Sequence, residues 1–264
     1  MAKKRRRTSV WLVKKQRAQA WLEQARSLLA EDHPESALAT LHRLFKMVPD
    51  GSSECFEAAN LMGVCWMYLD EVEQAYQAFT LALTGFPDAA DILLHRGMPG
   101  RMTRRSLQSV LDFYKALAVA KEAGYEELSK LVLAQLQISY QAAKEEICLR
   151  GLDFATDRLI ELQDLSARAC HLVDLEEFEE AVPILRRAIE MDLDVQPYDW
   201  ADLGNCLLQL DQIEEAEKAL KRALEIDPHY EYAQQCLEDI AKPRAEGAAI
   251  ALVQQEATQA TSAA

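Results

Sequence analysis

One stretch of the sequence, residues 198–228, places apolar side chains at the spacing of two consecutive helices. The first stripe, at i, i+3, i+4 and i+7, consists of Trp200, Leu203, Gly204 and Leu207. The second stripe consists of Ala216, Leu220, Ala223 and Leu224. Gly204 and Ala216 are small, which predicts that the two helices cross closely there. Pro228 lacks an amide hydrogen and restricts Asp227, so the second helix is expected to end at this point.

This spacing, W-x2-L-G-x2-apolar followed by A-x3-apolar and Pro, resembles the tetratricopeptide repeat, whose period is about 34 residues. Leu207 and Leu220 stand where that family usually has aromatic residues. The resemblance implies stacked helix pairs, because one pair alone cannot bury both of its apolar stripes. We therefore predict an all-α fold, a right-handed α-solenoid of antiparallel helix pairs with irregular helices in the centre.

Earlier parts of the chain repeat this pattern. The second unit is the clearer copy and contains Ala59, Met62, Gly63, Trp66, Ala75, Phe79, Ala82 and Pro87. The first unit has Ala25 in place of the glycine and contains Ala37, Leu41, Leu44 and Pro49. An acidic pair recurs at the turns as Asp32/Glu35, Asp70/Glu73 and Asp211/Glu214, and we interpret each pair as a capping box that starts the second helix.

The central part of the sequence departs from this repeat pattern. Residues 97–101, Gly-Met-Pro-Gly-Arg, contain strong helix breakers and are predicted to form a loop. A degenerate repeat is predicted after it, with its turn at Gly124. The expected organisation is a basic, partly disordered tail (1–17), two units (18–88), degenerate or elongated units (89–165), two units (166–228), a capping helix (229–242) and a disordered tail (243–264).

The charge is unevenly distributed. Residues 1–17 carry eight Lys and Arg and no acid, so the remainder has 21 basic and 43 acidic residues. A body this acidic repels phosphate backbones, which leaves the tail as the candidate for binding nucleic acid or an anionic membrane. The tail could equally fold back on the acidic solenoid. The candidate anion-binding residues are Lys3, Lys4, Arg5, Arg6, Arg7, Lys14, Lys15 and Arg17.

No catalytic or metal-binding motif appears. The histidines are dispersed without HExxH spacing, and the sequence has no GxSxG, P-loop or GxGxxG. The six cysteines form no CxxC pair, and Cys65 and Cys206 occupy equivalent repeat positions, which indicates packing. We predict no enzyme activity, no cofactor and no metal. The cysteine pattern and the lack of a long apolar run favour a cytoplasmic protein without a transmembrane segment or signal peptide.

The function expected from the resemblance is that of a protein–protein interaction adaptor, whose first helices line a concave groove for a peptide or protein segment. The groove candidates are Glu57, Asn60, Val64, Met67, Tyr68, Tyr198, Asn205, Leu208 and Gln209. Two alternatives remain: an assembly or secretion-type chaperone that holds an apolar segment, and a nucleic-acid-associated regulator that uses the tail. A chaperone-type carboxylate clamp is not supported, because Ala201 replaces its lysine and Val64 its asparagine.

Overall fold

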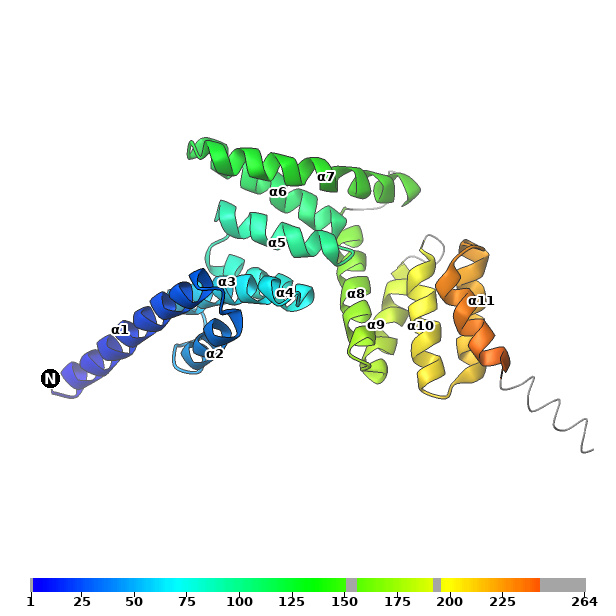
Figure 1. The fold of residues 1–264 in the computed structure, drawn as a ribbon, viewed down its shortest axis with the longest axis horizontal. Helices are drawn as coiled ribbons and strands as arrows, with labels where there is room; N and C mark the ends of the chain where they lie inside the picture. The colour runs from blue at the N-terminus through cyan, green and yellow to red at the C-terminus, as the bar shows by residue number, and fades with distance from the viewer. Residues whose placement is uncertain (1, 151–155, 192–195, 243–264) are drawn as a thin grey trace, which may run out of the picture. The chain divides into compact units, whose positions relative to one another are not determined.

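The computed structural model describes residues 2–150, 156–191 and 196–242, which contain helices and no strand (Figure 1). The helices are α1 (Ala2–Ala30), α2 (Pro34–Phe45), α3 (Ser53–Tyr68), α4 (Val72–Gly85), α5 (Ala90–Met102), α6 (Ser106–Glu122), α7 (Glu126–Arg150), α8 (Thr156–Asp174), α9 (Phe178–Met191), α10 (Pro197–Gln209), α11 (Ile213–Ile226) and one over 231–242. The all-α prediction is confirmed.

The chain divides into two compact units, Met1–Phe154 and Ala155–Ala264, here called unit 1 and unit 2. This division falls inside the segment 89–165 that the sequence analysis treats as one. Within each unit, helices that follow one another pack together through short turns. In unit 1 the first helices of the pairs, α1, α3, α5 and α7, also contact one another in that order, and the second helices are α2, α4 and α6. In unit 2 the first helices are α8 and α10, and the second helices are α9 and α11.

Every helix pair contains the same buried combination of residues. A small residue in the first helix is followed 16 positions later by a large apolar residue in the second helix, and where the small residue is glycine the two are in close contact. The pairs are Ala25/Leu41, Gly63/Phe79, Gly97/Phe113, Ala169/Leu185 and Gly204/Leu220. At Gly204 an added Cβ would lie 2.6 Å from Leu220 Cγ and 3.3 Å from the carbonyl oxygen of Ala216. The predicted close crossing is therefore present, and any side chain there would push the helices apart.

The pair α5–α6 corrects the sequence analysis, which reads residues 97–101 as a loop. These residues lie inside α5, and Gly97 follows Gly63 by 34 residues, which is one full repeat. A Cβ at Gly97 would lie 2.3 Å from Phe113 Cε1, so glycine is required for the approach of α6. This tertiary packing outweighs the low helix propensity of the glycines and the backbone hydrogen bond that is missing at Pro99. The third repeat is therefore α5–α6, and α7 follows it as an additional long first helix.

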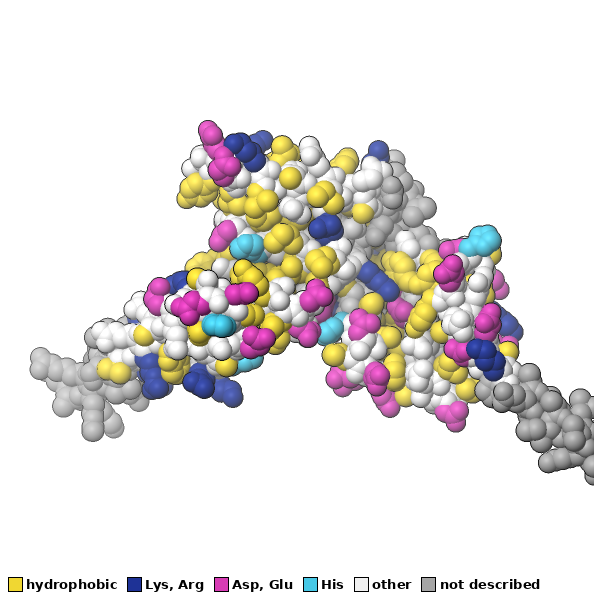
Figure 2. All heavy atoms as spheres, viewed as in Figure 1, with side chains coloured by type: hydrophobic (Ala, Val, Ile, Leu, Met, Phe, Trp, Pro, Cys, Tyr) yellow, Lys and Arg dark blue, Asp and Glu magenta, His cyan; other side chains and the backbone are white. Residues whose placement is uncertain are grey.

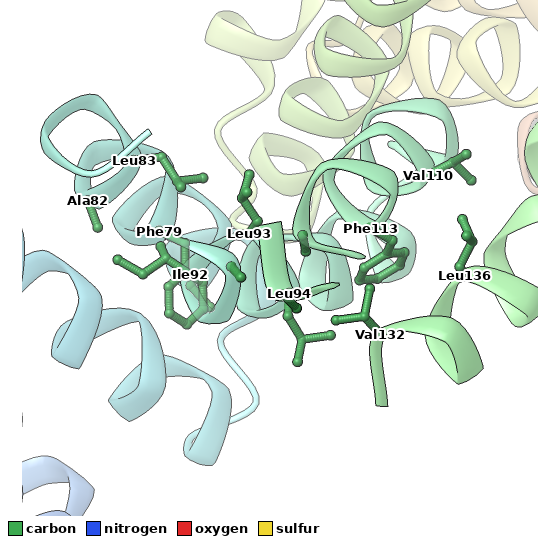
Figure 3. Close-up of a cluster of buried hydrophobic side chains, with 14 of the residues drawn as sticks. Phe79, Ala82, Leu83, Ile92, Leu93, Leu94, Val110, Phe113, Val132 and Leu136 are labelled. Carbon is green, nitrogen blue, oxygen red and sulfur yellow. The ribbon is translucent and has the colours of Figure 1, made fainter. Parts of the chain in front are cut away.

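A continuous apolar core joins the second and third repeats to α7 (Figure 3). Phe79 from α4 and Phe113 from α6 are each at most 1 % exposed, and Leu93 and Leu94 of α5 are also buried in this core. Val132 and Leu136 extend the core along α7. Because α7 contributes to the core that α5 and α6 share, its addition buries the end of the stack in unit 1.

The turns within the pairs are C-terminal caps of the first helices, and the predicted capping boxes are wrong. Asp32, Asp70 and Asp211 have φ near +60°, and the second helices begin without a side-chain cap at His33, Glu71 and Gln212. At the second repeat the amide of Glu71 donates to the carbonyl of Trp66 (2.9 Å) and that of Asp70 to Met67 (3.4 Å). This is the Schellman pattern, in which a left-handed residue satisfies the last carbonyls of a helix.

The same turn at Glu176 gives a stability prediction. Glu176 has φ +61°, but it lacks the short side chain that lets aspartate adopt this left-handed conformation. The amide of Glu176 donates to the carbonyl of Val173, and the amide of Glu177 donates to the carbonyl of Leu172. Glu176→Gly is expected to stabilise unit 2 by about 0.5–1 kcal/mol, since glycine removes the left-handed strain at some cost in chain entropy. Urea unfolding followed by circular dichroism measures the change. Asp211→Gly is the matched variant with a smaller expected gain, and a loss of stability in Glu176→Gly would contradict the assignment.

The N-terminal segment also differs from the expectation of a partly disordered tail. Helix α1 begins at Ala2 and runs without a break to Ala30. Residues 2–30 contain no glycine or proline and are rich in Ala, Lys, Arg and Gln, which have high helix propensity. Ala18, Leu22 and Ala25 anchor the helix in the core of the first repeat. The helix propagates from this anchor towards the N-terminus, because each further residue adds a hydrogen bond without a new nucleation cost.

Candidate functional site

The first helices of unit 1 present the residues predicted for the groove. We call the exposed side of α3 and α5 the first-helix face. Tyr68, at the end of α3, is 61 % exposed. Val64 and Met67 are only partly buried and pack against the core of unit 1. The positions chosen from the repeat pattern therefore lie at the surface of α3, with their inner ends supported by the core.

The sequence analysis missed the continuation of this face on α5. Met102 lies 34 residues after Tyr68 and is 54 % exposed, and Met98 holds the same relation to Val64 and is half-buried. Because α3 packs against α5, equivalent positions of the two helices are neighbours. The signal was available in the 34-residue spacing, but residues 97–101 had been read as a loop. Tyr68 and Met102 are thus exposed apolar residues at the equivalent position of two first helices that contact each other.

Polar groups also lie on these first helices. Asn60 of α3 is half-buried, and its Oδ1 has no hydrogen-bond partner among the described residues. Glu57, one turn earlier, accepts a hydrogen bond from Arg26 of α1 (Nη2–Oε2 3.2 Å). In α5, burial lowers the pKa of His95, against the opposing effect of Asp91. The first-helix face thus contains a buried amide oxygen without a described partner, and the nearby Glu57 carboxylate is already paired with Arg26.

The predicted groove residues of unit 2 form a separate set. Tyr198 and Asn205 on α10 are half-buried, and Leu208 packs against the core of unit 2. Gln209 is exposed, and its Nε2 donates to Asn205 Oδ1 at 3.5 Å. Five of the groove candidates therefore lie on α3 of unit 1 and the other four on α10 of unit 2.

The basic residues of α1 are partly engaged within unit 1. Lys15 Nζ lies 3.7 Å from Glu54 Oε1 of α3, and the guanidinium carbon of Arg17 lies 4.6 Å from the centre of the Trp21 ring. Lys14 is exposed. The side chains from Lys3 to Arg7 lie outside the described residues. For Lys15, the contact with Glu54 favours the alternative in which the basic segment folds onto the acidic repeats.

Two surface hollows lie between consecutive second helices, one in each unit. In unit 1 a hollow of about 390 Å³ lies between α4 and α6, and in unit 2 a hollow of about 610 Å³ lies between α9 and α11. In the unit 1 hollow the charges are satisfied. Arg96 forms two hydrogen bonds with Asp112 (2.7 and 2.5 Å), and Lys115 donates to the carbonyl of Pro87 (2.7 Å).

Among the described residues, no three His, Cys, Asp or Glu side chains are placed to hold a metal ion. Burial raises the pKa of Cys65 to about 11 and that of Cys206 to about 12, so both thiols stay protonated and unreactive at neutral pH. Within the described part of the chain, no helix has the length and apolar character needed to cross a membrane.

Solved structures of low similarity include several repeat proteins. The TPR domain of P58(IPK) is 17 % identical with a TM-score of 0.48, over 90 % of this chain and 68 % of that one. PilF of Pseudomonas aeruginosa is 12 % identical with a TM-score of 0.40, over 87 % and 85 %. The TPR2AB domain of yeast Sti1 in complex with an Hsp90 peptide is 12 % identical with a TM-score of 0.38, over 88 % and 86 %. No curated protein sequence matches the chain.

The family assignment comes from sequence profiles. Profiles described as tetratricopeptide repeat match residues 22–97 and residues 197–230. The first match begins at Leu22 in α1, covers α2, α3 and α4 and continues to Gly97 in α5, and the second covers α10–α11. Both matched segments show the buried contact between a small and a large residue described above. The chain therefore contains tetratricopeptide repeats in residues 22–97 and 197–230.

Proposed function

We propose that this protein is a non-enzymatic adaptor that binds a peptide segment of a partner on the first-helix face of unit 1. Tetratricopeptide repeats support a protein–protein interaction scaffold as the general function. The observation that carries the specific proposal is that Tyr68 and Met102 are both exposed at the equivalent position of two first helices in contact, and we call this pair the apolar ridge. Aromatic and methionine side chains are typical anchors of binding surfaces, because they bury a large apolar area on contact and methionine adapts its shape.

Asn60 gives this surface a means of orienting a peptide. Its Oδ1 is buried without a partner among the described residues, and such an acceptor is costly unless a donor fills it. A backbone N–H of a bound segment is a suitable donor once the side-chain amide turns outward, because Oδ1 is buried in the free protein. The apolar ridge would then supply affinity, and Asn60 would fix the register of the segment. The candidate set Tyr198, Asn205, Leu208 and Gln209 stays a prediction of a second such face in unit 2.

The double substitution Tyr68→Ala/Met102→Ala tests the proposal. We expect it to reduce partner recovery by about tenfold or more, since the loss of central anchors at an interface commonly costs 2 kcal/mol or more. The fold should be unaffected because both side chains are more than half exposed. Recovery is measured by affinity capture of the full chain from an extract of its own cells, with quantitative mass spectrometry.

The matched control is Tyr114→Ala. Tyr114 is 50 % exposed but lies on the second helix α6, so its loss removes an exposed aromatic side chain comparable to Tyr68 from another part of unit 1. Partners of the first-helix face should be retained by this variant. If Tyr68→Ala/Met102→Ala recovers the same partners as the wild type, the first-helix face is not the binding surface.

A further inference from the structure

The hollow of about 610 Å³ in unit 2 has an apolar floor. We call it the outer groove, since it lies between the second helices α9 and α11 and reaches down to α10. Its floor consists of Ile189, Trp200, Leu203, Leu207 and Ala219. Trp200 is the largest of these and remains partly exposed. A volume of this size is typical of sites that hold a small ligand or a few side chains of a partner.

The rim of the outer groove is charged on both sides. Arg186 and Glu190 come from α9, and Glu215, Lys218 and Arg222 come from α11. Arg186 Nη2 lies 2.9 Å from Glu215 Oε2, which neutralises that pair across the groove. Arg222 is paired with Glu225 within α11 (2.6 Å). Among the described residues Lys218 has no such partner, so the α11 side presents an available cation above the apolar floor.

The position of these cations is unusual for this unit. Residues 155–264 contain nine Lys and Arg and 24 Asp and Glu, and acidic side chains are spread over the visible face of unit 2 (Figure 2). Five of the nine cations lie on α9 and α11. Three of those five, Arg186, Lys218 and Arg222, line the outer groove. The groove therefore gathers three of the nine cations of this acidic unit above an apolar floor, and Lys218 is the one without a described carboxylate partner.

We propose that the outer groove of unit 2 is a second docking site, for a peptide segment in which a bulky apolar residue is flanked by carboxylates. The apolar side chain lies against Trp200 and Leu203, and a carboxylate contacts Lys218. Glu190 repels carboxylates on the α9 side, so the acidic flank of the segment lies over α11. This site is on a different unit from Tyr68 and Met102, and it does not depend on the first-helix face.

The probe is a phage-displayed library of random dodecapeptides, selected on the immobilised full chain. Selected peptides are then synthesised and their affinities measured by fluorescence anisotropy. We expect a class of peptides that contains Trp, Phe or Leu next to Asp or Glu. Their affinity for Lys218→Glu should be at least about tenfold lower, because the attracting cation becomes a repelling anion, and it should fall in 0.5 M salt.

The matched control is Lys221→Glu, the same charge change one turn along α11. Lys221 pairs with Glu217 and does not line the groove, so its replacement should change affinity by less than about twofold. Glu190→Gln should tighten binding, and Tyr68→Ala should leave this peptide class unaffected. Loss of binding in Tyr68→Ala but not in Lys218→Glu would overturn the second site while leaving the first-helix face intact.

Other outcomes also decide the proposal. Failure to select any peptide that depends on Lys218, or selection of Lys- and Arg-rich peptides that do, would overturn it. Concentration-dependent association of the full chain that Lys218→Glu abolishes, measured by sedimentation, would assign the groove to a second copy and also overturn it. Equal melting temperatures of the Lys218→Glu and Lys221→Glu variants establish that a difference in binding is not a difference in folding.

Discussion

Glu73→Ala is expected to lower the free energy of unfolding of unit 1 by about 3–5 kcal/mol, because it leaves a buried guanidinium without its carboxylate. Arg105, which precedes α6, is 1 % exposed, and Glu73 of α4 is 4 % exposed. Two parallel hydrogen bonds join them, Nη1–Oε2 at 2.6 Å and Nη2–Oε1 at 2.9 Å. The guanidinium also lies 4.2 Å from the centre of the Tyr76 ring and donates to Thr103 Oγ1. Urea unfolding of the full chain, followed by circular dichroism, measures the loss.

The double variant Glu73→Leu/Arg105→Met separates the cost of an orphaned charge from the value of the pair. Replacing both partners with apolar side chains of similar size should recover most of the stability lost in Glu73→Ala, since neither buried charge remains. In Glu73→Ala, backbone amides of α4–α6 should exchange hydrogen faster than in the wild type, because the pair joins the second repeat to the third in this region. Unchanged unfolding of Glu73→Ala would show that the pair contributes nothing to this junction. Lys130→Ala, which breaks an exposed pair with Glu127, is the control and should cost less than 1 kcal/mol.

The buried contact between Glu73 and Arg105 could not be predicted from local patterns in the sequence. Its distance of three residues from Asp70 resembles a capping box, and the same spacing recurs at Glu35 and Glu214. The structure instead places Asp70 in a left-handed turn and turns Glu73 towards Arg105, 32 residues away. A contact over that separation leaves no periodic signal in a single sequence. The helices themselves were predictable, because each one carries its own apolar stripe.

In the candidate site, too, one residue was predictable from the repeat pattern and others were not. Tyr68 was predicted as a surface residue because the repeat pattern fixes which side of the first helix is buried. Met102 occupies the same position one repeat later, but Gly97, Pro99 and Gly100 had marked that segment as a loop. Propensity is a weak indicator where close packing rewards small residues, and here Gly97 receives Phe113 and Gly100 receives Ser109. The outer groove was missed because it forms only when α9 and α11 lie on either side of α10.

The third repeat can be tested through its central contact, Gly97 against Phe113. Gly97→Ala is expected to destabilise unit 1 by about 1–3 kcal/mol, because its Cβ would lie 2.3 Å from Phe113 Cε1. Phe113→Leu alone should cost roughly 1–2 kcal/mol, since it leaves a cavity at a fully buried position. The combination Gly97→Ala/Phe113→Leu recreates the contact found at Ala25/Leu41 and Ala169/Leu185. It should therefore be more stable than the sum of the single effects predicts, by about 1–2 kcal/mol.

This coupling distinguishes a repeat from a loop that merely contains glycines. A small residue and a large one, 16 positions apart, compensate for each other only if α5 and α6 cross at that point, as the first and second helices do in the other pairs. Gly63→Ala/Phe79→Leu should show the same compensation in the second repeat, whereas Gly97→Ala combined with Leu220→Ala in unit 2 should be additive within about 0.5 kcal/mol. Strict additivity in Gly97→Ala/Phe113→Leu, measured in the same urea unfolding experiments, would mean that the two side chains do not meet. Residues 90–122 would then not form the third helix pair.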